Sequence, residues 1–386
     1  MIGTSLHLLG LLAFSTVKAL TLPAPDGQYG TASSQMLLTD RSRQDPYTTT
    51  SNFRHVVVSS FYPVALREDC IDYTAQYMPN ATAAFYDQQL GAFGIPAETF
   101  ASLRLTHCNA RGRRDLKDQQ FPVVLFSPGL GNSRLIYSAM AQALASKGYI
   151  VISIDHPFDA DIVEFPDGST ALAANITTDA QIEAALEVRS SDITFVIDEL
   201  RSSQLSRKLL GDKVRINQKQ YAIYGHSLGG ATAAVAASSD NRLTAAVNLD
   251  GTFFGSVVSC GATKPLLIVS HEGKNLTTDP SWTSTWNATR KTTKAAVTLP
   301  GTAHGSYTDY PLIVHALGVP AEARDQFVDL IGAVPGALLR EVVSSVVDHF
   351  VDYSQCREKQ PLPELNGTGL GGMQVLGKSE KARRCR

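Results

Sequence analysis

The chain has 386 residues, of which 44% are hydrophobic and 18% are charged, so it can bury a large core and is not expected to be disordered. Its net charge is −2, from 34 basic and 36 acidic residues. No global field would therefore draw the protein to nucleic acid or to an anionic membrane, and this balance favours a small-molecule partner.

The N-terminal segment MIGTSLHLLGLLAFSTVKAL has an apolar stretch from Leu6 to Phe14. It predicts a secretory signal peptide over residues 1–19, although no Lys or Arg precedes the apolar stretch; an N-terminal core helix is the alternative. The stretch is too short to span a bilayer, and no later segment has the roughly 18 consecutive apolar residues of a transmembrane helix. We therefore expect a secreted, extracellular protein without a transmembrane segment.

Glycosylation and disulfide bonding are expected for a secreted chain. Asn-x-Ser/Thr sequons occur at Asn80, Asn175, Asn275, Asn287 and Asn366. The five cysteines predict two disulfides and one odd thiol, and we expect the pairs Cys70–Cys108 and Cys260–Cys356. Since no CxxC, HExxH or other dense ligand cluster occurs, the sequence predicts no metal and no cofactor.

The first two predicted strands, HVVVSSFYP and SLRLTHC, are expected to be antiparallel edge strands. From Phe121 onwards, apolar runs alternate with amphipathic helical runs, of which one lies near residues 180–205 and another follows Ser227. The apolar runs predict the strands FPVVLFS, YIVISID, YAIYG, LTAAVNLD, KPLLIVS and KAAVTLP. Near-continuous apolar strands separated by helices predict an α/β fold, with a mostly parallel central sheet and helices on both faces, which is a three-layer sandwich.

The domain organisation is expected to be simple. We find no internal repeat and no domain boundary, so residues 20–361 are expected to form one catalytic domain. The motif EFPDGST, after the strand that ends at Asp155, predicts a hairpin turn. Residues 362–386 are glycine-rich and then basic, and we expect a flexible tail.

The stretch YAIYGHSLGG, residues 221–230, is typical of a tight strand-to-helix turn that exposes a serine. Gly225 and Gly229 fit the requirement for small neighbours, because a Cβ there would clash as strand and helix approach. Ser227 is therefore the candidate nucleophile. The amide of Leu228, at the start of the helix, can donate to a developing oxyanion.

A serine nucleophile needs an imidazole base and a carboxylate that orients it, in the chain order Ser, acid, His. His304 lies in a loop after the last predicted strand and is the best candidate base. His271 ends the strand KPLLIVS, where an acid or a spacer is usual. His315 and His349 lie in helical runs and are expected to be surface histidines or histidines with satisfied hydrogen bonds, and His226 is expected to be structural.

The carboxylate cannot be chosen from the pattern alone. Asp250 ends the strand LTAAVNLD, and Glu272 follows the next strand, so both remain open. Asp309 is set aside as a solvated loop carboxylate or a helix cap. The turn FSPGLGNS, with its two glycines, is expected to supply a second oxyanion donor, the amide of Leu130, although an ordinary strand-to-helix turn also uses glycines.

Several ordered blocks of the chain resemble the platelet-activating factor acetylhydrolases of the plasma type, also called lipoprotein-associated phospholipases. The blocks lie between about His55 and Pro320 and include SFYP, YMPNATAAFYDQQLG, VVLFSPGLGNSRLIYSAMAQALASKGYIVISIDH, GHSLGG, NLDGTFF and GTAHGSYTDY. With the predicted leader and the sequons, the resemblance suggests a secreted fungal member. One departure is Pro128, where the animal enzymes carry a histidine.

The resemblance implies the α/β-hydrolase fold, a triad of Ser227, Asp250 and His304, and oxyanion amides at Leu130 and Leu228. It implies hydrolysis of short or oxidised sn-2 acyl esters of phospholipids through an acyl-enzyme, without calcium or a cofactor. The alternatives are a carboxylesterase or cutinase-like hydrolase of soluble esters or polyesters, and a non-catalytic binding protein on this scaffold.

Contact with a lipid surface is a further expectation. Trp282 and Trp286 are four residues apart on a predicted helix, and a second apolar stripe consists of Leu339, Val342, Val343, Val346, Val347 and Phe350. Either stripe can touch lipid, and the alternative is that both pack on the sheet.

Overall fold

The computed structural model describes residues 19–48, 52–91, 95–110, 116, 119–211, 214–319, 324–363 and 372–382. Residues 1–18 of the predicted signal peptide lie outside these ranges, as do the sequon at Asn366 and the last cysteine, Cys385.

The central sheet has nine strands in the order β14-β13-β12-β11-β10-β6-β7-β3-β2. From β13 to β7 all neighbours are parallel, whereas β14, β3 and β2 pair antiparallel. The strands are β2 (Tyr29–Gln44), β3 (Phe53–Leu66), β6 (Gln120–Ser127), β7 (Ile150–Asp155), β10 (Arg215–His226), β11 (Leu243–Leu249), β12 (Leu266–Ser270), β13 (Lys294–Thr298) and β14 (Gln374–Ser379). The predicted mostly parallel sheet is confirmed.

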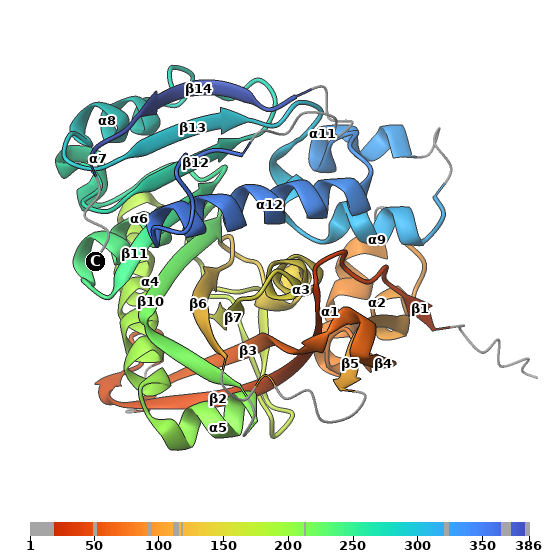
Figure 1. The fold of residues 1–386 in the computed structure, drawn as a ribbon. Coiled ribbons are helices and arrows are strands. Elements are labelled where there is room, and N and C mark those ends of the chain that lie inside the picture. The colour runs from red at the N-terminus through yellow and green to blue at the C-terminus, as the bar shows by residue number, and fades with distance from the viewer. Residues whose placement is uncertain are drawn as a thin grey trace, which may run out of the picture.

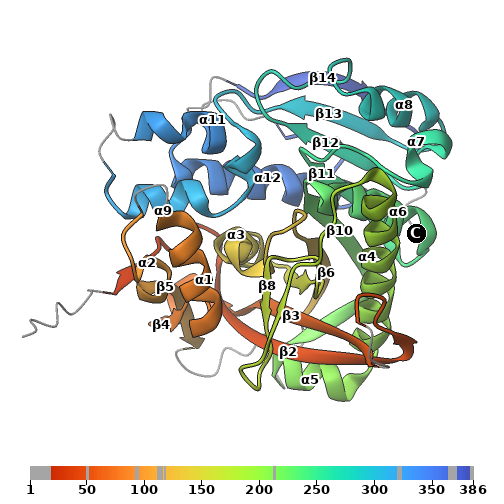
Figure 2. The same ribbon diagram turned by 180° about the vertical axis from the view of Figure 1, so that it is seen from behind.

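Helices cover both faces of this sheet (Figures 1 and 2). Along β6, Val124 and Phe126 point into the core that includes α3 and α12, whereas Val123 and Leu125 point into the core that includes α4 and α6. The helices are α1 (Asn80–Gly91), α2 (Thr99–Ser102), α3 (Ser138–Ser146), α4 (Asp179–Leu200), α5 (Ser203–Leu210), α6 (Leu228–Ser239), α7 (Ser256–Cys260), α8 (Pro280–Ala288), α9 (Tyr310–Ala316), α11 (Val328–Ile331) and α12 (Gly336–Ser354). Short 3₁₀ turns are η1 (Arg67–Asp69), η2 (Arg134–Tyr137), η3 (His304–Tyr307) and η4 (Asp325–Phe327).

Neither of the two predicted edge strands lies at the edge of its sheet. HVVVSSFYP lies in β3, which is not an edge strand because it pairs with β2 on one side and β7 on the other. SLRLTHC lies mainly in β5 (Leu103–Ala110), which joins β1 (Leu20–Thr21) and β4 (Cys70–Gln76) in a separate three-stranded sheet. The predicted turn at EFPDGST is confirmed, since it joins the antiparallel strands β8 (Ile162–Glu164) and β9 (Thr170–Leu172).

The prediction of a flexible tail is wrong for residues 374–379, which form β14 at the edge of the central sheet (Figure 1). Leu376 packs against the core, and Gly377 lies so close to Trp286 that a Cβ would come within 2.8 Å of the ring. This strand satisfies the outer backbone groups of β13, which would otherwise be an open edge.

The apolar stripes on α8 and α12 face the core, as the alternative interpretation expected. Trp282 and Phe350 are fully buried, and Trp286 packs against the core. Helical residues Asp325–Ser354 are long and apolar enough to cross a membrane, yet 50% of their most apolar window is buried. Within that segment, α12 packs against α3 and α9, as a core helix does.

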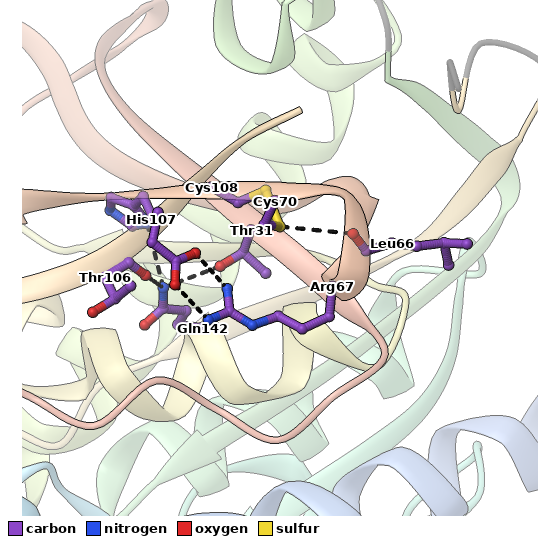
Figure 3. Close-up of a disulfide and its surroundings, with 9 residues drawn as sticks. Thr31, Leu66, Arg67, Cys70, Thr106, His107, Cys108 and Gln142 are labelled. Carbon is purple, nitrogen blue, oxygen red and sulfur yellow. Dashed lines mark hydrogen bonds and ion pairs between the residues drawn. A yellow bond between two sulfur atoms is a disulfide. The ribbon is translucent and has the colours of Figure 1, made fainter. Parts of the chain in front are cut away.

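The disulfide between Cys70 and Cys108 is confirmed and joins β4 to β5 (Figure 3). Near the disulfide, the Gln142 side chain of α3 donates to Thr31 Oγ1 at 3.0 Å and to the Thr106 carbonyl at 2.6 Å, which ties α3 to both sheets. The predicted pair Cys260–Cys356 is wrong.

Cys260 is a free, exposed cysteine. Cys356 is disulfide-bonded, and its partner is not Cys260. Cys260 lies at the end of α7, and no rule of sequence spacing identifies which of the late cysteines stays unpaired.

We expect replacement of both Cys70 and Cys108 by serine to lower the free energy of unfolding by about 2–4 kcal/mol, because the bond closes a loop with a sequence separation of 38. Urea unfolding measures the change. Cys260→Ser is the matched control and should stay within about 0.5 kcal/mol of the parent chain. Equal stability of the double variant and the control would contradict a stabilising role.

Candidate active site

Ser227 occupies a strained turn between β10 and α6, with φ 54° and ψ −125°. The turn depends on its glycines. A Cβ on Gly225 would lie 2.1 Å from the Gly229 carbonyl oxygen, and one on Gly229 would lie 1.9 Å from that of Ser127. The predicted requirement for small residues at positions 225 and 229 is confirmed. The strained backbone of Ser227 projects its side chain away from the turn.

Asp250 follows β11 directly and is completely buried. Its carboxylate accepts a hydrogen bond from His304 Nδ1 at 2.5 Å. Glu272, the competing carboxylate, instead accepts from the amide of Gly301 at 2.9 Å. The structure therefore pairs His304 with Asp250, and a histidine that donates through Nδ1 carries its lone pair on Nε2, where it can accept a proton.

A second imidazole shares this carboxylate. His271 Nδ1 donates to the same Asp250 Oδ2 at 2.7 Å, and Lys274 Nζ lies 3.9 Å from Oδ1. Burial opposes ionisation of Asp250, but the hydrogen bonds from His271 and His304 and the charge of Lys274 outweigh it and hold the pKa of the carboxyl well below its usual range. An acid or a spacer is expected at the position of His271, so its contact with Asp250 does not follow from the sequence; its place directly after β12 is the one signal for it.

His304 begins η3, and its ring is half-exposed and 4.6 Å from the ring of His226. The Ser227 amide donates to the Leu249 carbonyl at 2.9 Å, which brings the elbow against the end of β11. The predicted site residues are thus gathered at the carboxyl ends of neighbouring strands, where parallel sheets place their sites. Among the described residues the Ser227 hydroxyl has no hydrogen bond to His304, so the contact forms when one or both side chains rotate, as is common before substrate binds.

His226 connects three parts of the site, which gives its expected structural role a specific form. Its Nε2 donates to the His304 carbonyl at 3.0 Å, so Nδ1 is the acceptor that faces the Tyr137 hydroxyl at 2.9 Å. Tyr137 in turn accepts from the amide of Gly129 at 3.3 Å. Burial lowers the pKa of His226 to about 3, so the ring stays neutral and holds the loop of His304.

The turn at residues 128–131 lies beside the serine, because a Cβ on Gly129 would be 3.3 Å from Ser227 Cβ. Arg189, fully buried, holds the turn by donating to the Pro128 carbonyl at 2.6 Å and to the Gly129 carbonyl at 3.2 Å. Pro128, the departure from the animal enzymes, thus contributes its carbonyl to this clamp.

Two amides at the site have no protein acceptor among the described residues. The amide of Gly129 donates to the Tyr137 hydroxyl and that of Gly131 to the Asp159 carbonyl, whereas the Leu130 amide between them has no acceptor among the described residues. The Leu228 amide opens α6, where the first residues of a helix lack an intrahelical acceptor. Both amides remain available to a ligand oxygen, as the expected oxyanion site requires.

A cavity of about 410 Å³ lies beside the imidazoles and is lined by His271, Glu272, His304, Val328 and Asp329, among others. Ser227 is not among its lining residues. Neither His315 nor His349 lines this cavity; His315 is exposed on α9, and His349 Nε2 donates to the Gln360 carbonyl at 2.9 Å. The expectation that these two histidines take no part is consistent with their places.

Asp309 is a helix cap and not a solvated carboxylate. It is buried and accepts from the amides of Ala139 and Met140, at 2.7 and 3.1 Å, in the first turn of α3, and from the Tyr77 hydroxyl at 2.7 Å. Burial raises its pKa from 3.8 to about 7 against the effect of these donors. The residue anchors the segment after His304 to α3.

Asp309→Asn should change how stability depends on pH. Because the folded pKa exceeds the unfolded value of 3.8, the proton stabilises the folded state, and this contribution falls as pH rises towards about 7. Asparagine does not ionise, so the free energy of unfolding of the variant should rise relative to that of the parent between pH 3.8 and about 7, by up to roughly 4 kcal/mol. Urea unfolding at several pH values measures the difference, and parallel curves would contradict the raised pKa.

Known proteins resemble this chain along most of its length. The family model for platelet-activating factor acetylhydrolase, isoform II, matches residues 44–201 and 191–319. "Probable 1-alkyl-2-acetylglycerophosphocholine esterase" of Arthroderma benhamiae is 29% identical over 365 residues, 89% of this chain and 90% of that relative. The platelet-activating factor acetylhydrolase of Cavia porcellus is 27% identical over 215 residues, 50% of this chain and 49% of its own.

A solved ferulic acid esterase from Streptomyces cinnamoneus has a TM-score of 0.75 and 27% identity, covering 93% of this chain and 100% of its own. The likeness confirms the α/β-hydrolase fold. Since the family model spans more than half of the residues, the chain belongs to the platelet-activating factor acetylhydrolase, isoform II, family.

Proposed function

We propose that this chain is a calcium-independent serine esterase that hydrolyses short or oxidised sn-2 acyl esters of phospholipids, like a 1-alkyl-2-acetylglycerophosphocholine esterase. One observation carries the proposal: in a member of this family, a buried carboxylate at Asp250 orients His304 beside the strained turn of Ser227. The names of the relatives supply the substrate class.

In this mechanism Ser227 Oγ attacks the ester carbonyl while Nε2 of His304 takes the hydroxyl proton. Asp250 stabilises the imidazolium that results, and the amides of Leu130 and Leu228 donate to the oxyanion. His304 then protonates the departing alcohol, leaving the acyl group on Ser227. A water molecule, deprotonated by the same imidazole, releases the acid and restores the serine.

The protein is further proposed to be a secreted glycoprotein. The disulfide between Cys70 and Cys108 supports an oxidising compartment. The sequon asparagines Asn80, Asn175 and Asn287 are exposed and Asn275 is half-buried, so glycans can be accommodated.

Peripheral contact with lipid is proposed at α11 instead of at the buried stripes. Val328 and Leu330 expose 39% and 50% of their surface, and Val328 also lines the cavity beside His304. An apolar patch at the edge of the site suits a substrate that is drawn from a lipid surface.

A second candidate function keeps the chemistry and changes the substrate to soluble esters or polyesters. The solved ferulic acid esterase, which covers nearly all of this chain, favours it. A binding protein without catalysis remains the third and weakest candidate, since it has no need of a buried carboxylate that orients an imidazole.

We expect Ser227→Ala to lower ester turnover by about a thousandfold or more, because it removes the attacking oxygen. Circular dichroism and urea unfolding check that the fold is retained. Ser259→Ala, on the exposed side of α7, is the matched control and should keep the parent rate. Unchanged turnover in a purified Ser227→Ala chain would remove the assignment.

The substrate preference is tested with the same purified parent chain. Short-acyl choline phospholipids are offered beside p-nitrophenyl esters and a polyester film, with Ser227→Ala as the blank. The proposal expects cleavage of the phospholipid. Cleavage of the simple ester and the film alone would favour the second candidate.

A further inference from the structure

One carboxylate oxygen at the site accepts from two imidazoles, although the proposed mechanism needs only one. His304 Nδ1 and His271 Nδ1 lie 2.5 and 2.7 Å from Asp250 Oδ2. One ligand atom from each of the three residues lies within 4.8 Å of the others. His271 therefore adds a nitrogen atom that could bind a metal and that ester hydrolysis does not need.

Two imidazole nitrogens and a carboxylate oxygen form a ligand set typical of Zn²⁺ and Cu²⁺ sites. Tetrahedral zinc, with bonds of about 2.0–2.2 Å, holds its ligand atoms roughly 3.3–3.5 Å apart. The present nitrogen–oxygen separations must widen by less than about 1 Å to reach that spacing. Both imidazoles reach solvent, with side-chain exposures of 51% at His304 and 30% at His271, so their rings can shift around the fixed carboxylate.

The surroundings allow an ion to enter from one side. His271 and His304 line the cavity of about 410 Å³, and the carboxylates of Glu272 and Asp329 line it too, which favours a dication there. On the other side of Asp250, Lys274 Nζ lies 3.9 Å from Oδ1 and 3.3 Å from Asp279. Its charge opposes a second cation, so we expect weaker binding than at a dedicated zinc site. Hard cations such as Mg²⁺ and Ca²⁺ prefer several oxygen ligands and do not suit this set.

We propose that a divalent transition metal, zinc or copper, binds between His271, His304 and Asp250 and inhibits the enzyme. The metal takes the place of the two Nδ1 protons; each ring releases its Nδ1 proton and takes one up at Nε2, so both imidazoles remain neutral ligands and no proton is lost overall. His304 then no longer donates to Asp250, and its Nε2, which now carries the proton, cannot accept the proton of Ser227. The inhibition rests on the proposed roles of Ser227 and His304; the binding does not.

Binding is tested with zinc chloride and a Cys260→Ser, Ser227→Ala chain, which lacks the free thiol as a competing ligand and needs no activity. Isothermal titration calorimetry should give one ion per chain. Loss of outer-shell partners alone weakens metal sites by about 10–100-fold, so loss of a ligand in His271→Asn should weaken binding at least tenfold. His315→Asn, which removes an exposed histidine on α9, should leave affinity unchanged. Equal affinity in His271→Asn and His315→Asn would overturn the site.

Inhibition is tested on the chain with Ser227 intact. Zinc should inhibit ester hydrolysis, magnesium should not, and a chelator should restore the rate. His271→Asn, compared with its own metal-free rate, should require at least about tenfold more zinc for half inhibition. Identical zinc sensitivity would overturn the proposed mode of inhibition. A chain without esterase activity would overturn the proposed function, while the calorimetry would still decide the metal site.

Discussion

The buried carboxylate of Asp250 is the group on which the geometry of the whole site depends. A charge without solvent is costly unless it is paired, and here two imidazoles and Lys274 surround it. Its backbone has φ 60°, and the next residue, Gly251, exchanges two hydrogen bonds of 2.7 Å with the Asn248 side chain. The carboxylate is therefore oriented before any substrate arrives, and His304 is aimed by it.

The turn that faces Ser227 is held from behind by charged groups that never reach solvent. Arg189 pairs with Asp159 and clamps the carbonyls of residues 128 and 129. One strand further, Asp192 binds His156, whose other ring nitrogen contacts the Ser127 hydroxyl at the end of β6. Such pairs contribute little net stability but fix one arrangement of the backbone, which is what an oxyanion site requires.

The serine turn and the parallel sheet could be predicted from the sequence, because each depends on a local pattern of residues. The elbow glycines are required within a few residues of Ser227, and the alternation of apolar runs with helices specified the parallel sheet. The sequence could not separate Asp250 from Glu272, because both end neighbouring strands; only the folded path of the His304 loop distinguishes them. The resemblance to the family, and not the pattern, selected Asp250.

Other features depend on contacts between distant segments and were missed for that reason. The tail was expected to be flexible because it is glycine-rich, yet its short apolar run pairs with the open edge of β13. The role of His271 does not follow from the sequence, because a histidine after a strand has no distinctive pattern and its partner, Asp250, lies 21 residues earlier. The pairing of the cysteines after residue 250 likewise depends on which segments the fold brings together.

In this account the Asp250 carboxylate orients His304, His304 takes the proton of the Ser227 hydroxyl, and the amides of Leu130 and Leu228 bind the oxyanion. A crystal structure of the chain inactivated by an organophosphonate tests it most directly. We predict phosphorus bonded to Ser227 Oγ, its oxygen held by the amides of Leu130 and Leu228, and His304 still donating to Asp250. An adduct on another residue, or one whose oxygen is held by other donors while His304 points away, would contradict it.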